Sequence, residues 1–396
     1  MLILVVNCGS SSIKFQLIET DDKEVMASGQ VERIGLDGLL TYKAHGRKEV
    51  VEVDAHNHEA ALLDIINALL DEKKGVIHSL NQIEAVGHRI VHGGERFSHS
   101  VIIDDDVIKG IQDVTDLAPL HNPANLMGIR ACMDLMPKVV QVAVFDTAFH
   151  QTMPPRAYLY GLPLNYYKEY GVRKYGFHGT SHSYVSERVA ELVGLDYHSS
   201  RIVVCHIGSG ASVCAVKNGE SIDTSMGMTP LEGVCMGTRS GDIDPGLIQY
   251  IHEKEGISIS EIMNILNKKS GVLGLSEISN DYRDLLLAEK QGNLNAKYAI
   301  DIMIYSVRKY VGAYFMALGG IDAIALCGGV PENNSVLRGK MVKSFRAIGC
   351  ELDNIANEEI GVEKLITKRE SEIPVWVVPT NEELKIAMET YELINE

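Results

Sequence analysis

Two short glycine- and serine-rich segments follow apolar runs and have the composition of phosphate-binding turns. The first begins where the apolar run 2–6 ends at Asn7, and residues 8–14 then supply Gly9, three serines and Lys14. An unbroken apolar run is typical of a strand buried on both faces, and the alternation over 12–17 predicts a return strand. This segment offers backbone N–H groups, hydroxyls, an amide and an ammonium group, all of which can bind phosphate. The common nucleotide-binding spacing Gly-x-x-x-x-Gly-Lys-Ser/Thr occurs nowhere in the chain.

The second segment, residues 201–216, repeats this pattern near the middle of the chain. An apolar run reaches His206, a small turn with Gly208, Ser209 and Gly210 follows, and an alternating segment returns. We interpret the pair as an internal duplication, with one phosphate-binding unit in each of two domains.

Two arginines are framed by glycines. Arg89 follows an apolar strand inside the segment 87–95, and Arg239 lies in the segment 236–245. A guanidinium group at a strand end suits a planar oxyanion such as a carboxylate or a phosphoryl group. His88 and His92 are four residues apart, as zinc ligands on a helix would be, but the following double glycine argues against a helix. A non-metal role is therefore favoured for these histidines.

Three further polar residues lie at the ends of expected elements. Asp146 ends an apolar strand and could orient an arginine, act as a base, reach a metal through water, or only cap a turn. His178 precedes helix-starting Thr and Ser residues, where it could donate to an anion. Thr380 and Glu383 predict a capping box, which puts Glu382 in a first helical turn at the carboxyl end of a strand.

The bulk composition limits the partners. The 396 residues include 37 basic and 53 acidic side chains, for a net charge of −16, which argues against nucleic acid and membrane surfaces as partners. Seven cysteines without a Cys-x-x-Cys pair, and no leader or membrane span, predict a cytoplasmic protein with reduced thiols. An anionic substrate then needs a local basic cluster.

The expected elements alternate as in an α/β protein. Beyond the two repeats, strands are expected at 83–88, 139–145, 321–326 and 374–378. Helices are expected at 58–72, 105–118 and 124–136, near 245–268 and 281–291, and at 294–318. We expect one domain at 1–150 with a C-terminal helix at 384–396, and a second domain at 151–383.

The motifs together resemble those of the acetate/propionate kinase family. The matching stretches, in the family's order, are 7–14, 87–95, 117–123, 145–151, 175–182, 223–233, 236–245 and 379–384. The resemblance implies two duplicated actin-like, ribonuclease H-like α/β domains with the active site in a cleft between them. It also implies a cytoplasmic homodimer, with the nucleotide side and the dimer interface in the second domain. The implied reaction transfers the γ-phosphoryl group of ATP reversibly to acetate, giving acetyl phosphate and ADP, with Mg2+ or, in its place, Mn2+.

The resemblance also implies roles for residues at matching positions. Arg89, Arg239, His178 and Asp146 would be catalytic, and Asn7 and Glu382 would place the metal, in part through waters. The acetate methyl group would contact Val91, Leu120, Phe177 and Pro230. The nucleotide would lie along Ser10, Ser12, Lys14, His206, Gly208, Ser209, Gly210, Asp281, Tyr282, Arg283, Gly329, Val330 and Asn333.

The sequence departs from the family pattern at two nucleotide-side positions. Ser209 replaces the usual asparagine of His-x-Gly-Asn-Gly, and Pro331 replaces the second glycine of Gly-Ile-Gly-Glu-Asn. Pyrophosphate as donor, and propionate or another short-chain carboxylate as acceptor, are the alternative enzyme hypotheses. The non-enzyme alternative is an actin-like protein that binds nucleotide; the complete set of acetate-side residues argues against it.

Overall fold

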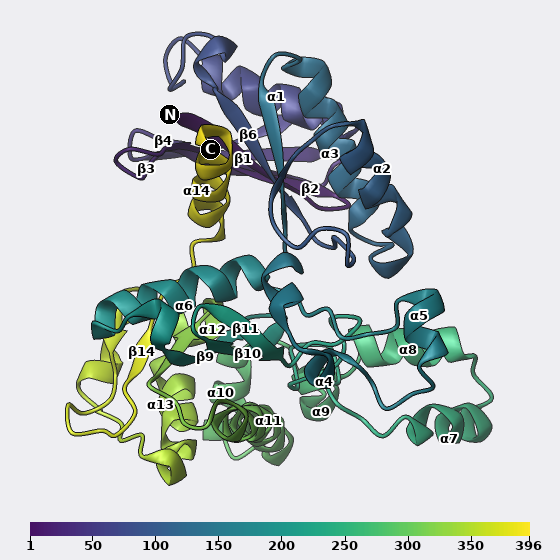
Figure 1. The fold of residues 1–396 in the computed structure, drawn as a ribbon, viewed down its shortest axis with the longest axis vertical. Coiled ribbons are helices and arrows are strands. Elements are labelled where there is room, and N and C mark those ends of the chain that lie inside the picture. The colour runs from purple at the N-terminus through teal and green to yellow at the C-terminus, as the bar shows by residue number, and fades with distance from the viewer. The chain divides into compact units, whose positions relative to one another are not determined.

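The computed structural model describes all residues from 1 to 396, and these form two compact units (Figure 1). Unit 1 comprises Met1–Gln151 and Asn381–Glu396, and unit 2 comprises Thr152–Thr380. Each unit contains one β-sheet and its own helices.

The sheet of unit 1 has eight strands in the order β5-β4-β3-β2-β1-β6-β8-β7. Strand β1 is antiparallel to β2 and parallel to β6, and β6 is parallel to β8. The strands are β1 (Leu2–Cys8), β2 (Ser12–Glu19), β3 (Glu24–Glu32), β4 (Gly38–Ala44), β5 (Arg47–Val53), β6 (Ala85–Ile90), β7 (Val101–Ile102) and β8 (Val140–Phe145).

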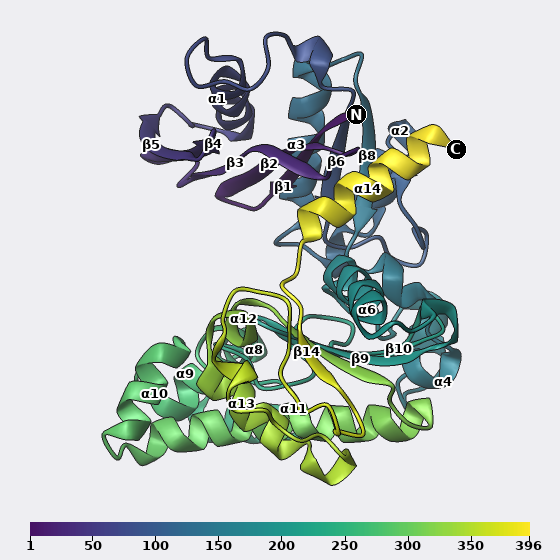
Figure 2. The same cartoon turned by 90° about the vertical axis from the view of Figure 1, so that its left-hand side faces the viewer.

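Helices cover both faces of this sheet, as the apolar run in β1 requires. Leu4 and Val6 pack in one core with helices α1 (His58–Leu70) and α3 (Asn122–Leu135). Ile3 and Val5 face the opposite side, where the C-terminal helix α14 (Glu382–Asn395) lies across β1, β6 and β8 (Figure 2). Helix α2 (Asp105–Asp113) packs beside α3.

The sheet of unit 2 repeats this topology. Its order is β11-β10-β9-β12-β14-β13, with β9 antiparallel to β10 and parallel to β12, and β12 parallel to β14. The short edge strand is also repeated, because β7 and β13 each pair antiparallel with the last parallel strand. The predicted duplication is therefore confirmed. The strands are β9 (Arg201–Ile207), β10 (Ala211–Lys217), β11 (Glu220–Thr224), β12 (Ala323–Cys327), β13 (Lys364–Leu365) and β14 (Val375–Val377).

Helices α6 (Gly179–Val193) and α11 (Leu294–Leu318) cover the two faces of this second sheet (Figure 2). The left-handed Gly319, with φ of 73°, ends α11 as expected. The remaining helices of unit 2 are α4 (Pro155–Tyr158), α5 (Asn165–Tyr170), α7 (Gly246–Glu255), α8 (Ile259–Lys268), α9 (Gly271–Ser276), α10 (Tyr282–Lys290), α12 (Gly329–Asn333) and α13 (Ser335–Ser344).

Two expected boundaries are wrong. The helix expected at 105–118 ends at Asp113 and is followed by a separate 3-10 turn, Thr115–Leu117. The N-cap of α14 is Asn381, whose side chain accepts from the N–H of Leu384, and not Thr380. The Thr380 hydroxyl is instead bonded to Ser181 at 2.7 Å, a partner that local sequence cannot reveal.

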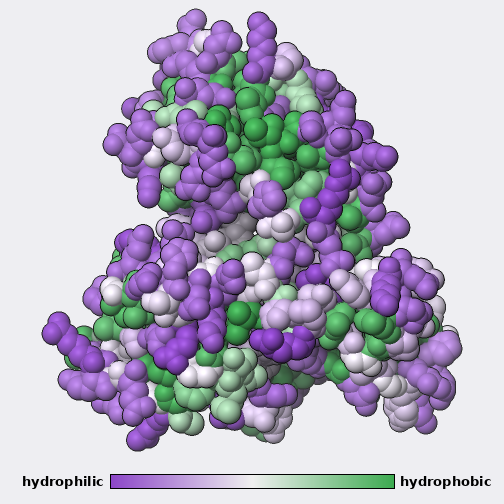
Figure 3. All heavy atoms as spheres, viewed as in Figure 1, coloured by the Kyte–Doolittle hydropathy of each residue, from purple (hydrophilic) through white to green (hydrophobic).

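No helix has both the length and the apolar character needed to cross a bilayer, although α11 has 25 residues. Hydrophilic residues cover most of the face seen in Figure 3. All seven cysteines are buried and free.

Candidate functional site

Arg89 and Asp146 meet at the carboxyl ends of the neighbouring parallel strands β6 and β8. The Arg89 Nε donates to Asp146 Oδ1 at 3.0 Å, and Nη2 donates to Oδ2 at 2.6 Å. Asp146 is 1% exposed, whereas the Arg89 side chain keeps 21% of its surface. Because a guanidinium group has five N–H donors, this bidentate pair leaves three of them for an anion.

Burial and charge act on this pair in opposite directions. Burial alone would lower the pKa of Arg89, but the carboxylates of Asp146 and Glu382 raise it above its ordinary value, so the guanidinium stays charged. Burial raises the pKa of the Asp146 carboxyl, and Arg89 opposes that rise. The pair therefore presents a fixed, oriented cation.

Two buried asparagines of α3 hold the backbone that follows Arg89. Asn125 Oδ1 accepts from the N–H of Val91 at 3.1 Å, and Asn122 Oδ1 accepts from the N–H of His92 at 3.2 Å. Asn125 also donates to the carbonyl of Cys8 at 2.8 Å, which ties this loop to the end of β1. The sequence reasoning missed both side chains, although Asn122 lies in a motif that matches the family.

The expected metal and phosphate groups of unit 1 lie on β1, β2 and α14. Asn7 and Lys14 are paired neighbours across the β1–β2 hairpin, with exposed Ser10 in its turn and half-buried Ser12 at the start of β2. Glu382 is the first residue of α14, and its buried Oε1 has no hydrogen-bond partner. An unsatisfied carboxylate oxygen at a helix N-terminus suits a cation or its water shell.

The four apolar residues expected at the acetate methyl group are divided between the units. In unit 1, Val91 is buried and Leu120 is 71% exposed. In unit 2, Phe177 is buried and Pro230 is half-buried. Their common role stays a prediction.

His178 and Arg239 of unit 2 both lie close to Gly210. A Cβ atom placed on Gly210 would be 3.2 Å from Arg239 Nη1 and 3.6 Å from His178 Nε2. Glycine therefore allows the two side chains to approach this backbone closely. Arg239 has no carboxylate partner, and its Nη1 donates only to the Pro230 carbonyl at 3.3 Å and weakly to the Met236 sulfur. Burial lowers the pKa of Arg239 below its ordinary value.

Serine hydroxyls organise the histidines of unit 2. Ser212 Oγ lies 2.8 Å from His178 Nδ1 and 2.7 Å from His182 Nε2. Ser181 Oγ lies 2.8 Å from His206 Nδ1. The His178 and His206 rings stack with centroids 4.3 Å apart. The sequence reasoning missed both serines, because their partners are distant along the chain.

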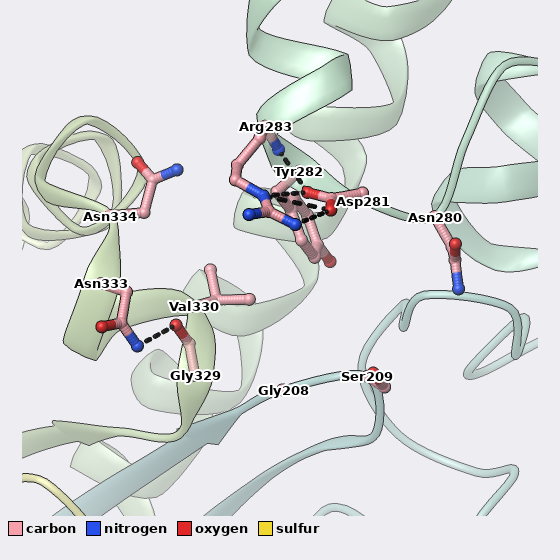
Figure 4. A pocket seen from close by; sticks show the side chains of 10 residues that line it. All are labelled: Gly208, Ser209, Asn280, Asp281, Tyr282, Arg283, Gly329, Val330, Asn333 and Asn334. Atoms are coloured by element: carbon pink, nitrogen blue, oxygen red, sulfur yellow. Dashed lines mark hydrogen bonds and ion pairs between the residues drawn. The ribbon is translucent and has the colours of Figure 1, made fainter. Parts of the chain in front are cut away.

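A cavity of about 450 Å³ in unit 2 contains eight of the thirteen residues expected at the nucleotide (Figure 4). They come from the loop after β9, the start of α10 and helix α12. Ser10, Ser12 and Lys14 belong to unit 1, whereas Gly210 follows the lining residue Ser209 and His206 lies two residues before the lining residue Gly208. The cavity is lined by Gly208, Ser209, Asp281, Tyr282, Arg283, Gly329, Val330 and Asn333, and also by Asn280 and Asn334, which the sequence reasoning missed.

The polar groups of this cavity are partly committed to one another. Asp281 caps α10 and pairs with the exposed Arg283, and Asn333 donates to the Gly329 carbonyl at 3.1 Å. The buried Tyr282 hydroxyl has no hydrogen-bond partner. Burial raises the pKa of Tyr282, so this group remains a neutral donor.

The two departures from the family pattern differ in their structural consequences. Ser209 is exposed at the cavity, where a longer amide would reach further into the space. Pro331 is the third residue of α12, within the first turn, where backbone N–H groups have no partner inside the helix. The missing N–H of proline therefore costs no helical hydrogen bond.

Comparisons with known proteins agree over the whole chain. A model of the acetokinase family matches residues 2–388. The acetate kinase of Lachnoclostridium phytofermentans is 55% identical over 395 residues, and that of Agathobacter rectalis 53% over 396, each covering 100% of both chains.

Solved structures give the same result. Acetate kinase from Porphyromonas gingivalis superposes with a TM-score of 0.96 at 48% identity, covering 99% of each chain. A propionate kinase from Francisella tularensis gives 0.92 at 41% identity, also covering 99% of each. The expected actin-like fold with two domains is confirmed by these matches. The chain belongs to the acetokinase family.

Proposed function

We propose that the protein is an acetate kinase, which transfers the γ-phosphoryl group of ATP reversibly to acetate. The observation that carries the proposal is Arg89, which both oxygens of Asp146 orient while three of its N–H groups stay available. An oriented guanidinium group with free donors matches a carboxylate or a phosphoryl group. The acetate kinases that are 50–55% identical over the full chain support the same activity.

The chemistry needs positioning and charge neutralisation more than covalent catalysis. Acetate is ionised at neutral pH, so one of its oxygens can attack the γ-phosphorus without a general base. The bond from that phosphorus to the bridging oxygen breaks, ADP leaves with the electron pair, and acetyl phosphate remains. Arg89 and Arg239 offset the repulsion between the two anions, and the N–H of His178 donates to the transferring group.

The proposal includes Mg2+ as the metal ion. Glu382 Oε1 is buried without a hydrogen-bond partner, which supports a water-mediated cation near it, and Asn7 would supply an amide oxygen. Mg2+ usually keeps several waters and takes few protein ligands together with substrate phosphates. When bound, the ion would neutralise phosphate charge; Arg89 stays oriented by Asp146 in either case.

ATP is proposed as the donor because the cavity in unit 2 has the size and chemistry for a nucleoside. Its volume of about 450 Å³ lies within the range of small-molecule sites. Its lining includes the hydroxyl group of Ser209, the guanidinium group of Arg283 and the amide of Asn333. Pyrophosphate would leave this cavity empty.

Propionate is proposed as a second, poorer acceptor. The propionate kinase from Francisella tularensis is 41% identical over 99% of this chain, so a similar framework supports that substrate. One methylene group changes binding by about 1–3 kcal/mol, which predicts a weaker rather than an absent activity.

We also propose a homodimer that forms through the outer face of α11. Tyr298, Ile302 and Tyr305 are each at least 43% exposed, and their spacing puts them on one face of this helix. A cluster of exposed large apolar side chains on one helix face is typical of an interface. Light scattering should give twice the 43.5 kDa chain mass, and Ile302→Glu should shift the mass toward the monomer.

Acetyl phosphate formation, trapped as the hydroxamate, tests the function directly. We expect turnover with acetate, ATP and Mg2+, weaker turnover with propionate, and none with pyrophosphate in place of ATP. Arg89→Ala should abolish turnover, whereas Arg201→Ala, which breaks a bidentate pair with Asp322 in unit 2, should retain it. Turnover only with pyrophosphate would reassign the donor. No turnover by folded protein that binds ATP would favour the nucleotide-binding alternative.

A further inference from the structure

Ser212 links two histidines of unit 2 through a single hydroxyl group. Its Oγ lies 2.8 Å from His178 Nδ1 and 2.7 Å from His182 Nε2. Ser212 lies in β10 with 0% exposure, and its hydroxyl has no third hydrogen-bond partner in the structure. A hydroxyl group has one proton to donate and lone pairs to accept with. Ser212 therefore donates to one histidine and accepts from the other.

Two features favour a neutral imidazole at His178. The residue is the N-cap of α6, a helix of 15 residues, and the positive end of the helix dipole disfavours a second positive charge there. The guanidinium group of Arg239 lies close to the same glycine, Gly210, as the His178 ring, and its charge acts in the same direction.

A neutral histidine carries its single proton on one of two nitrogens. His178 Nε2 is the nitrogen that faces Gly210 and Arg239. Only the tautomer protonated at Nε2 can donate to an anion on that side, because the other tautomer would present a lone pair to it.

We propose that Ser212 is a positioning residue that selects this tautomer. The Ser212 hydroxyl donates to Nδ1 of His178 and accepts the Nε2–H of His182, so the remaining proton of His178 lies on Nε2. No proton has to move during turnover, because the chain of donors is set before the substrate binds. The inference rests on the proposed function insofar as His178 donates to the transferring phosphoryl group.

The spectroscopic test uses protein labelled with ¹⁵N at histidine and needs no turnover. The signals of His178 are assigned by their absence in His178→Asn. In the full-length protein, we expect a pyridine-type Nδ1 and a pyrrole-type Nε2. In Ser212→Ala, we expect a mixture of tautomers or the reversed one. Ser181→Ala is the matched control, because that buried hydroxyl contacts His206 and Thr380 rather than His178, and it should leave the His178 pattern unchanged.

The kinetic test uses the same variants with acetate and ATP. In Ser212→Ala, kcat should fall by about tenfold to a hundredfold, the scale of losing one donor to the reacting group, while both KM values change less than about twofold. Ser212→Thr keeps the hydroxyl group on a strand that tolerates β-branching, and should restore both kcat and the tautomer. If Ser212→Ala does not fold, Ser212→Cys, a weaker donor of similar size, takes its place with an intermediate effect.

The outcomes separate this inference from the proposed function. An unchanged Nε2–H tautomer in folded Ser212→Ala or Ser212→Cys would overturn the role of Ser212, whatever the kinetics show. A reversed His178 tautomer with unchanged kcat in a Ser212 variant would show that tautomer selection by Ser212 does not contribute to catalysis, and would also overturn the proposal. Absence of turnover in the unmodified protein would overturn the proposed function instead, and the tautomer measurement would still decide the assignment.

Discussion

Arg89 and Asp146 form a bidentate ion pair between the ends of two parallel strands, with the carboxylate buried and the guanidinium partly open. Asp146 contacts Arg89 through both oxygens at 2.6 and 3.0 Å and is 1% exposed, so it has little surface left for contact with a substrate. Of the roles that the sequence left open for Asp146, orientation of an arginine is the one that this contact supports. The pair holds a flexible side chain in one orientation, which suits the anion-binding role proposed for Arg89.

Replacing Asp146 by asparagine tests this orientation. The amide offers one acceptor where the carboxylate offered two, and its NH2 group would face an N–H of Arg89. We expect kcat to fall about a hundredfold, because a misplaced reacting group costs that much. Asp322→Asn, in the Arg201–Asp322 pair, is the matched control and should keep the wild-type kcat. Full activity in Asp146→Asn would contradict the assignment.

Glu382→Gln should lower activity and leave stability intact or improved. The buried Oε1 of Glu382 has no hydrogen-bond partner, so the substitution breaks no hydrogen bond at this atom, and the relief of a buried charge offsets the lost attraction to Arg89. We expect a urea midpoint equal to or higher than that of the wild type, a kcat at least about tenfold lower, and a higher Mg2+ concentration for half-maximal rate. Glu383→Gln, at the next residue of α14, is the control for charge near the helix N-terminus. A loss of stability with normal Mg2+ dependence would mean that Glu382 is only structural.

The buried His88 should make the protein less stable in mild acid. Burial lowers the pKa of His88 from 6.5 to about 4, with Gln141 opposing the shift through a 2.8 Å hydrogen bond. Between these values the unfolded chain binds a proton that the native protein does not, so stability is full above pH 6.5 and falls toward pH 4. One such group contributes up to about 1.4 kcal/mol per pH unit to the slope.

His88→Gln should reduce this slope. Urea unfolding at several pH values between 4.5 and 6.5 measures it, and the variant should lose stability more slowly than the wild type as the pH falls. His56→Gln replaces a histidine whose side chain is 66% exposed, and it should leave the slope unchanged. Equal slopes in His88→Gln and the wild type would show that burial does not lower the pKa of His88 in the folded protein.

The sequence predicted the parts of the molecule that depend on local pattern. The repeated run and turn at 2–17 and 201–216 correctly predicted two related sheets, because buried strands and glycine turns are encoded within a few residues. The prediction that Thr380 is the N-cap of α14 was wrong, because the hydroxyl of Thr380 bonds to Ser181, 199 residues away in the chain. Ser212 was missed for the same reason: its partner His178 is 34 residues distant. Contacts of this kind depend on tertiary packing, so they produce no characteristic residue spacing in the sequence.

The two departures from the family pattern, Ser209 at the cavity of unit 2 and Pro331 in α12, should have different consequences when they are reversed. Ser209 is exposed at the cavity, so Ser209→Asn adds an amide donor where the family has one and should lower the KM for ATP by about fivefold. Pro331 occupies the first turn of α12 and gives up no helical hydrogen bond, so Pro331→Gly should leave that KM unchanged. It should instead destabilise the protein by about 1 kcal/mol, because glycine frees the unfolded chain.

Initial rates at saturating acetate and urea midpoints for both variants test this pair of expectations. Each variant is the control for the other, since one should move only the KM and the other only the stability. A lower KM in Pro331→Gly would show that proline blocks a backbone contact with the phosphates. An unchanged KM in Ser209→Asn would mean that the nucleotide is held without this turn, and binding would then rest on the α10 and α12 sides of the cavity.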